Sequence, residues 1–233
     1  MSNVGCRIFT EIPRPDKELV ERFRGLPVAN IGDNMNRIYC VDPAIKSLNG
    51  RPLLGVAYTI HAPSGDNLFL HKALEIAQPG DVIVIAAGGP ERAFFGELMM
   101  MSAQNHGYAG VIVDGYARDK DGIGKLDMPV YARGINPQGP YKNGPGEINV
   151  PIAFGGQVVF PGDIVIGDED GLIFVRPCDA EEILAKTIKQ HAKEDGLAES
   201  YEQGGVQPSY NPELREKTLE NLKVDIIEGC WQQ

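Results

Sequence analysis

The chain has 233 residues, of which 42% are hydrophobic and 23% are charged. This length and balance fit one compact soluble domain that buries a large core without disulfides. The formal net charge of −10 argues against nucleic acid as the main partner, because phosphate binding favours a basic surface.

Short helices and strands alternate through the first part of the chain. Apolar residues recur at intervals close to 3.6 in Asn67–Ala77, which predicts a helix with one buried face. On this helix His71 could act as a proton shuttle, but a bond to a nearby carbonyl is the expected arrangement. Pro79-Gly80-Asp81 predicts a turn. The predicted helices are Lys17–Phe23, Ile31–Asn36 and Asn67–Ala77, and the predicted strands are Leu53–Ile60 and Val82–Ala86.

The middle of the chain predicts a helix, a tight break and a buried strand. The helix begins between Arg92 and Gly96 and ends near His106. The apolar run Val111–Val113 is typical of a strand buried on both faces, and it is expected to end at Asp114-Gly115. Asp114 is expected either to orient the arginine that follows or to cap the turn from strand to loop.

Two carboxylates and one guanidinium fall at the ends of these elements. Glu97 lies in the first turn of the helix, and Arg118-Asp119 follow it after twenty intervening residues. Asp119 offers hard oxygen ligation for Mg²⁺ or Mn²⁺, and Arg118 offers a planar fork for a carboxylate. Gly88-Gly89 and Gly96 let backbone amides approach an anion. On spacing alone, an ordinary helix and a surface ion pair remain open alternatives.

The second half contains hairpins, an irregular loop and a polar tail. Asn136–Glu147 is rich in Gly, Pro and Asn, and it is either a functional or subunit-facing loop or a plain connection. Trp231 ends the tail and is expected to pack on its own or a neighbouring subunit. The predicted strands are Val130–Ala132, the pair Asn149–Phe154 and Gln157–Val159, and the pair Ile164–Gly167 and Leu172–Val175, while the helical segments are Ala180–Leu197 and Pro212–Ile227.

Most of the chain resembles the RraA-like family. Its aldolase members carry an acidic residue, twenty intervening residues and Arg-Asp. The stretches that resemble the family's first helix, its helix–turn–strand unit and its closing strand pair are VANIGDNMNR (28–37), GDNLFLHKALEIAQPGDVIVIAAGG (65–89) and PGDIVIGDEDGLIFVRP (161–177). The likeness covers about residues 20–197 of one domain spanning 1–233, with 199–233 as a C-terminal tail. It implies an α/β fold with a mixed central sheet or barrel-like core, of the swivelling β/β/α type.

Within this family the chain resembles the 4-hydroxy-4-methyl-2-oxoglutarate and 4-carboxy-4-hydroxy-2-oxoadipate aldolases, which also decarboxylate oxaloacetate. They are class II enzymes, in which a metal ion stabilises the pyruvate enolate. The resemblance implies that Asp119 ligates the metal directly, Arg118 binds substrate and helps to polarise the ketone, and Glu97 holds a metal-bound water. Some family aldolases have Asp at position 97, so the longer Glu97 side chain is expected to affect water placement and substrate preference.

The resemblance also assigns a substrate anchor and a ligand from another subunit. The backbone amides of Gly96, Glu97 and Leu98 would bind the pyruvate carboxylate at a helix N-terminus, which is a favourable anion site. Glu194 matches the Glu that a neighbouring subunit adds to the metal shell. The implied assembly is a homo-oligomer, a trimer or a hexamer.

The predicted function is a divalent-metal-dependent pyruvate aldolase or oxaloacetate decarboxylase. Both reactions break a C–C bond and leave an enolate, whose oxyanion the metal and Arg118 would stabilise. No side-chain base is evident, so a metal-bound water or hydroxide is expected to take that role. The alternative is a non-catalytic RraA-like regulator that binds a protein such as ribonuclease E. Such regulators lose the Asp of the Arg-Asp pair, so Asp119 favours the enzyme.

A third possibility, a menaquinone-pathway methyltransferase, is disfavoured because Ala86-Ala87-Gly88-Gly89 lacks a Gly-x-Gly pattern. The four cysteines form no Cys-x-x-Cys pair, and reduced thiols are expected. The charged N-terminal segment predicts neither a signal peptide nor a membrane anchor, so a cytoplasmic location is expected. The expected partners are a small anionic 2-oxo acid and further copies of the chain, with no nucleic acid and no membrane.

Overall fold

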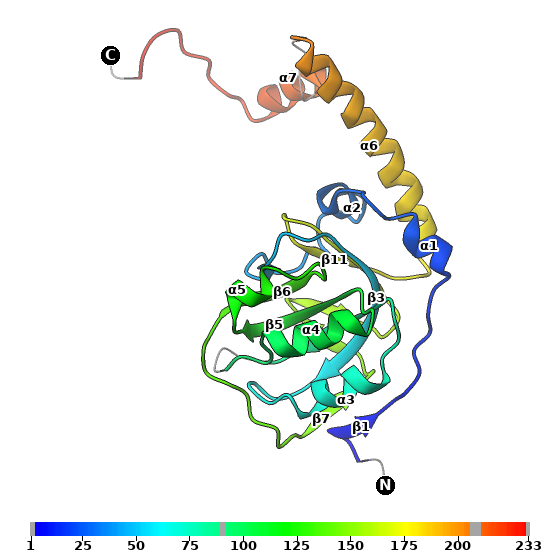
Figure 1. Cartoon of the computed structure of the whole chain (residues 1–233). Helices are drawn as coiled ribbons and strands as arrows, with labels where there is room; N and C mark the ends of the chain where they lie inside the picture. The colour runs from blue at the N-terminus through cyan, green and yellow to red at the C-terminus, as the bar shows by residue number, and fades with distance from the viewer. Residues whose placement is uncertain (1–2, 89–91, 206–210, 232–233) are drawn as a thin grey trace. The chain divides into compact units, whose positions relative to one another are not determined.

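A computed structural model describes residues 3–88, 92–205 and 211–231 of the chain (Figure 1). The chain divides into two compact units, Met1–His191 and Ala192–Gln233, and each is described by itself. The candidate residues Gly96, Glu97, Leu98, Arg118 and Asp119 all belong to the first unit, whereas Gly89 lies outside the described residues.

The first unit is organised around a mixed sheet of nine strands. Its centre is four parallel strands in the order β3 (Leu53–His61), β4 (Asp81–Ala86), β5 (Gly110–Ala117) and β6 (Val130–Ile135). Antiparallel strands extend the sheet on both sides of this centre. The other strands of the sheet are β1 (Cys6–Ile8), β2 (Lys46–Ser47), β7 (Gly146–Ile148), β10 (Ile164–Gly167) and β11 (Leu172–Val175). The predicted α/β fold with a mixed central sheet is confirmed.

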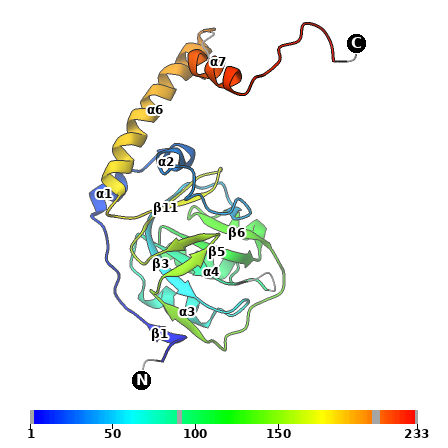
Figure 2. The same ribbon diagram turned by 180° about the vertical axis from the view of Figure 1, so that it is seen from behind.

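The two faces of the sheet are covered by different kinds of structure. In β4, Ile83 and Ile85 join one core cluster, while Val82 and Val84 join the other, as the alternation of a strand requires. The first cluster also receives buried residues from α3 (Leu68–Ile76) and α4 (Glu97–Asn105). The second cluster consists of strand and loop residues, including the hairpin β8 (Ile152–Phe154) and β9 (Gln157–Val159). Figure 2 shows this hairpin face, with the chain near residue 150 in front of the sheet.

The remaining helices of this unit also pack on the face of α3 and α4. Ile31, Ile123 and Leu184 belong to the first core cluster, and they come from three different helices. The predicted starts at Lys17 and Ala180 are confirmed, whereas α2 begins at Val28, three residues before the predicted Ile31, and the short helix α5 was not predicted. The helices are α1 (Lys17–Glu21), α2 (Val28–Asn34), α5 (Lys120–Ile123) and α6 (Ala180–Glu202), the last of which continues into the second unit.

Strand β5 departs from the prediction in length. It continues past Asp114-Gly115 to Ala117, with a shift of register between Val113 and Tyr116 opposite β6. Among the described residues, Asp114 bonds neither to Arg118 nor to a turn amide of its own loop. Its carboxylate instead accepts hydrogen bonds from Arg133 and, at 2.8 Å, from the backbone N–H of Gly155. Asp114 therefore fastens β6 and the β8–β9 turn to β5.

The second unit contains the end of α6 and the helix α7 (Pro212–Asn221). Asn211 caps α7, since its side-chain oxygen accepts hydrogen bonds from the backbone N–H groups of Glu213 and Leu214. Every residue of α7 is at least partly exposed, and Trp231 is 91% exposed. Within the described residues of the second unit no residue buries the Trp231 side chain, and its packing on its own or a neighbouring subunit stays a prediction.

Candidate active site

Backbone pairing brings the two halves of the predicted motif together. The segment before α4 runs beside the end of β5: the N–H of Phe94 donates to the carbonyl of Tyr116 at 2.8 Å, and the N–H of Arg118 donates to the carbonyl of Phe95 at 3.0 Å. The next residues on the two sides are Gly96 and Asp119. Gly96 and Asp119, 23 positions apart in the sequence, thus become neighbours at the carboxyl end of a parallel strand, where α/β proteins commonly bind ligands.

The first residues of α4 and α5 contact each other. Asp119 adopts the left-handed conformation (φ 61°) that Asp tolerates better than most residues, and its Oδ2 accepts a hydrogen bond of 3.2 Å from the Glu97 N–H. A Cβ atom at residue 96 would overlap the Asp119 carboxylate. In return, the Glu97 carboxylate lies against Gly122, where a Cβ would overlap it. A larger residue at either position would therefore displace the carboxylate that lies against it.

Arg118 remains available to a ligand. Its Nε lies 3.6 Å from Asp119 Oδ2, which is an ion pair but too long for a hydrogen bond. The two side chains are 44% and 45% exposed, so water screens their attraction. The guanidinium also lies close to the backbone of Gly139, because a Cβ there would be 2.9 Å from Nη1.

A cavity of about 210 Å³ joins these groups to two other parts of the chain. Sequence reasoning missed Lys142, although it lies in the Gly- and Pro-rich loop for which a function was one alternative. His71 was expected to be structural, yet it lines this cavity. Burial, followed by the positive charge of Lys142, lowers the pKa of His71, so its imidazole is neutral near pH 7. The lining residues are Asn67, His71, Phe95, Gly96, Leu98, Met99, Arg118, Asp119, Pro140 and Lys142.

Asn67 is a second residue that sequence reasoning missed. It is 1% exposed, and its Nδ2 donates to the carbonyl of Phe94 at 2.8 Å, which holds the segment leading into α4. Its Oδ1 is buried without a hydrogen-bond partner among the described residues. Its place directly before a helix is the signal that could have marked it, since Asn favours such positions.

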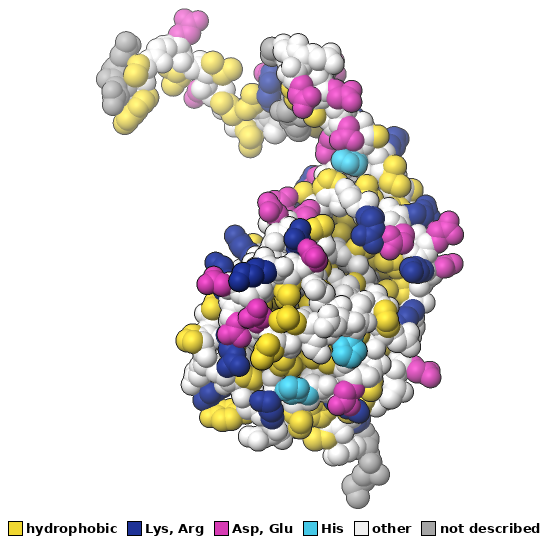
Figure 3. All heavy atoms as spheres, in the orientation of Figure 1, with side chains coloured by type: hydrophobic (Ala, Val, Ile, Leu, Met, Phe, Trp, Pro, Cys, Tyr) yellow, Lys and Arg dark blue, Asp and Glu magenta, His cyan; other side chains and the backbone are white. Residues whose placement is uncertain are grey.

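The predicted amide anchor at the start of α4 is partly occupied. The Glu97 N–H donates to Asp119, so the positive end of the helix binds a carboxylate of the chain itself. The side chain of Leu98 is 80% exposed beside it. Hydrophobic side chains gather on this face over α3 and α4 (Figure 3). The predicted roles of the Gly96, Glu97 and Leu98 amides toward a substrate stay predictions.

The carboxylates fit a divalent cation that keeps part of its water shell. Across residues 3–88, 92–205 and 211–231, no group of three or more His, Cys, Asp or Glu side chains could hold a metal. Mg²⁺ needs fewer, because it is commonly held through one or two carboxylates and several waters. Asp119 lines the cavity and can supply one such carboxylate, whereas Glu97 is not among the lining residues and its carboxylate lies against Gly122. Glu194 lies in α6 beyond His191, in the second unit, and its predicted contribution from a neighbouring subunit stays a prediction.

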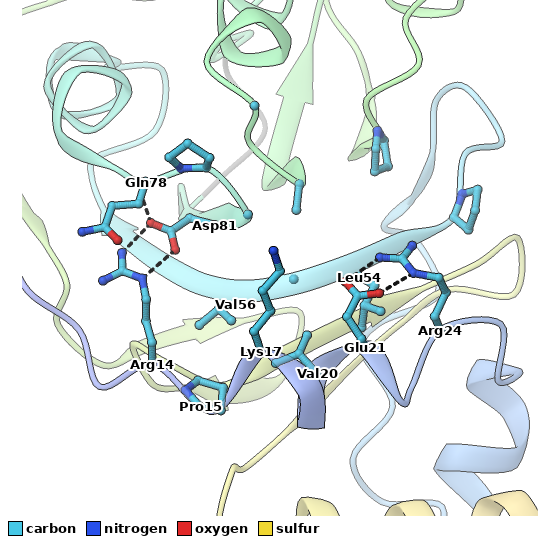
Figure 4. Close-up of a pocket in the computed structure, with 17 residues that line it drawn as sticks. Arg14, Pro15, Lys17, Val20, Glu21, Arg24, Leu54, Val56, Gln78 and Asp81 are labelled. Carbon is cyan, nitrogen blue, oxygen red and sulfur yellow. Dashed lines mark hydrogen bonds and ion pairs between the residues drawn. The ribbon is translucent and has the colours of Figure 1, made fainter.

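A larger groove, of about 570 Å³, lies at the opposite edge of the parallel strands (Figure 4). Arg14 donates to the buried carboxylate of Asp81 at 2.7 and 3.2 Å, and Arg24 donates to Glu21 at 2.7 and 2.9 Å. Both guanidinium groups already have carboxylate partners. The groove therefore lacks the combination of a weakly paired Arg and an acidic ligand that marks the smaller cavity.

Comparisons with known proteins give the family of this chain. The family model described as Aldolase/RraA, RraA-like, matches residues 28–174. A protein of Halalkalibacterium halodurans, named "Putative 4-hydroxy-4-methyl-2-oxoglutarate aldolase", is 37% identical over 180 residues, which are 76% of this chain and 86% of that protein.

Solved structures agree with this assignment. A Streptomyces coelicolor protein, titled an unusual member of the RNase ES inhibitor RraA family, has a TM-score of 0.71 and 28% identity over 81% of this chain and 99% of that one. A Geobacillus kaustophilus protein titled S-adenosylmethionine:2-dimethylmenaquinone methyltransferase has a TM-score of 0.59 and 32% identity over 64% and 94%. With the family model matching more than half of its length, this chain belongs to the RraA-like family.

Proposed function

We propose that this protein is a divalent-metal-dependent lyase that cleaves a C–C bond of a small 2-oxo acid and releases pyruvate. Its substrate is a 4-hydroxy-2-oxo acid, or oxaloacetate in a decarboxylation. The observation that carries the proposal is the joining of Arg118 and Asp119 to the start of α4, in a cavity that also holds Lys142. The aldolase name of a 37% identical relative supports the same reaction class.

The chain's own residues account for binding and charge stabilisation. The Arg118 guanidinium can bind the carboxylate and the 2-oxo oxygen through its planar fork, while Lys142 supplies a second positive charge for a distal carboxylate. When the C–C bond breaks, its electron pair moves onto the 2-oxo oxygen, beside Arg118. Aldol cleavage also needs an acceptor for the 4-hydroxyl proton. His71, neutral near pH 7, is the side chain of the cavity suited to accept it at an imidazole nitrogen.

A divalent cation, Mg²⁺ or Mn²⁺, would be held by Asp119, with Glu97 nearby. When bound, it supplies the positive charge that stabilises the oxyanion of the enolate. This part of the proposal is supported by the hard-oxygen donor set and by the half-exposed position of Asp119.

The direct test is pyruvate release from oxaloacetate and from 4-hydroxy-4-methyl-2-oxoglutarate. The assay is run with Mg²⁺, with Mn²⁺ and after exhaustive treatment with EDTA. We expect activity on at least one substrate that disappears with the chelator and returns with added metal. Undiminished activity after chelation would contradict the metal-dependent mechanism, and no pyruvate from either acid would contradict the lyase.

The same proposal includes a site shared between subunits of a cytoplasmic trimer or hexamer, with Glu194 of one subunit completing the metal shell of the next. A head-to-tail contact of this kind must close into a ring to avoid a filament. Mixing inactive Asp119→Asn and Glu194→Gln subunits should then restore some activity, because mixed rings contain interfaces with both residues intact. A fully active monomer, or no rescue after confirmed subunit exchange, would count against the shared site.

A second candidate is a regulator that binds a ribonuclease. The observation that favours it is the 28% identity to a structure titled as a member of the RNase ES inhibitor family. Asp119 favours the enzyme over this candidate. Two results together would favour the regulator over the enzyme. They are inhibition of ribonuclease E by the chain at stoichiometric concentration and the absence of pyruvate in the assay above.

A further inference from the structure

The loop after β6 is tied down across the cavity. In this loop the N–H of Tyr141 donates to the carbonyl of Gly65 at 2.7 Å, and the carbonyl of Tyr141 accepts from the N–H of Asn67 at 3.0 Å. The N–H of Asn143 donates to Asp66 Oδ2 at 2.6 Å. A segment rich in Gly and Pro thereby gains the fixed backbone of a short parallel bridge.

Arg92 holds the same loop through its side chain. Its Nη1 donates to the carbonyl of Gly139 at 3.0 Å, and its Nη2 donates to the hydroxyl of Tyr141 at 2.9 Å. The guanidinium carbon also lies 4.1 Å from the centroid of the Tyr141 ring, which is within cation–π range. The methylenes of Arg92 lie against Gly65, where a Cβ would have no room. One side chain therefore fixes both residues that flank Pro140.

The intervening residues face the ligand cavity. Arg92 contacts residues 139 and 141, while Pro140 and Lys142 line the cavity. This is the alternation expected of an extended chain, whose successive side chains point in opposite directions. The loop also touches the other cation of the cavity, because Gly139 lies against the Arg118 guanidinium. The hydrogen bonds of Arg92 to this loop thus help to set the position of Lys142 relative to Arg118.

We propose that Arg92 and Tyr141 are positioning residues that select a dicarboxylic 2-oxo acid. They hold Lys142 at the distance from Arg118 at which both carboxylates of one ligand are bound. This inference rests on the proposed function and deepens it. A monocarboxylic 2-oxo acid has no second carboxylate for Lys142 to bind. Its affinity should therefore not depend on Arg92.

Binding measurements test this without relying on turnover. Calorimetric titration with Mg²⁺ present compares 2-oxoglutarate, a dicarboxylate, with pyruvate, a monocarboxylate. The wild-type protein should bind 2-oxoglutarate more tightly than pyruvate. Arg92→Ala should raise the Kd for 2-oxoglutarate at least tenfold while changing the Kd for pyruvate less than threefold. With oxaloacetate as substrate, the same variant should raise KM at least tenfold and change kcat less than threefold. Tyr141→Phe keeps the ring but loses the hydroxyl acceptor, so it should give an intermediate effect.

A double mutant separates positioning from a general loss of structure. In a Lys142→Ala background, Arg92→Ala should cause no further loss of 2-oxoglutarate affinity, because the residue it positions is gone. Arg24→Ala, at the opposite edge of the sheet, is the matched control and should behave as wild type. Two results would overturn this inference and leave the proposed function standing. One is additive losses of 2-oxoglutarate affinity in the double mutant; the other is an equal loss of affinity for both acids in both Arg92→Ala and Tyr141→Phe. Failure of the wild type to bind either acid would overturn the proposed function and this inference with it.

Discussion

The two edges of the parallel strands both carry an arginine and an aspartate, but in different states. At the amino edge, Arg14 grips Asp81 with two hydrogen bonds, and the Asp81 side chain is 2% exposed. Asp81 Oδ2 also accepts the N–H of Gln78 at 2.8 Å. At the carboxyl edge, Arg118 and Asp119 lie 3.6 Å apart and are both nearly half exposed.

The difference shows that pairing, not residue type, separates a structural site from a candidate active site. A buried and fully hydrogen-bonded pair has no remaining capacity for a ligand, and breaking it exposes an uncompensated charge. A loose and solvated pair contributes little to stability, yet each member can bind an ion of opposite charge. Mutations at the two edges should therefore have opposite consequences for activity and for stability.

The largest effect is expected at the carboxyl edge. Asp119→Asn should lower kcat/KM for pyruvate release on the order of 10³-fold, because a neutral amide is a poor ligand for a hard cation. Its unfolding midpoint in urea should stay close to that of the wild type. Full activity of this variant would show that Asp119 does not hold the metal.

Arg118→Lys should lower kcat/KM by on the order of 10²-fold, which corresponds to about 2.7 kcal/mol. A lysine keeps the charge but cannot form the two parallel hydrogen bonds of a guanidinium with a carboxylate. Steady-state kinetics with oxaloacetate measures the change. A loss below about threefold, well under 1 kcal/mol, would assign Arg118 a purely structural role.

At the amino edge, Asp81→Asn should reduce the free energy of unfolding by about 2 kcal/mol and leave the specific activity of the folded protein unchanged. Breaking a buried pair costs more than this, but Arg14 is 29% exposed and water compensates part of the loss. Urea denaturation provides the measurement. Glu21→Gln, which breaks the exposed pair with Arg24, is the control and should cost at most about 0.5 kcal/mol. Equal losses in both variants would remove the distinction between buried and exposed pairs.

The smallest effect concerns a paired carboxylate that lies near the carboxyl edge. Arg7 donates a hydrogen bond to Glu147 at 2.5 Å and holds the pKa of that carboxyl below its ordinary value of 4.5. The stabilisation is therefore present above pH 4.5 and is lost as the pH falls through the lower pKa of the folded state. Glu147→Gln should flatten the pH dependence of stability between about pH 5 and pH 3, by less than about 1 kcal/mol, because Arg7 is 34% exposed. An unchanged slope in urea titrations at these pH values would contradict this.

Local signals in the sequence determined the elements and the central motif of this protein. The apolar spacing of Asn67–Ala77 predicted α3, and the glycine pair 155–156 predicted the β8–β9 turn, because both patterns act between residues close in the chain. Glu97, Arg118 and Asp119 were recognised as one set from their spacing and their resemblance to the RraA-like family. The chain's membership of that family is now shown by the match over residues 28–174.

Tertiary structure decided how that set is assembled and what completes it. The contact of Glu97 with Gly122, and of Asp119 with Gly96, depends on the pairing of the segment before α4 with the end of β5. Lys142 lies in the cavity on a loop that hydrogen bonds from distant residues hold, among them bonds to Gly65 and from Arg92, nearly fifty residues earlier. An irregular loop has no periodic pattern of its own, so its conformation is set by whichever distant groups satisfy its backbone. That is why the sequence revealed the motif and the fold revealed its surroundings.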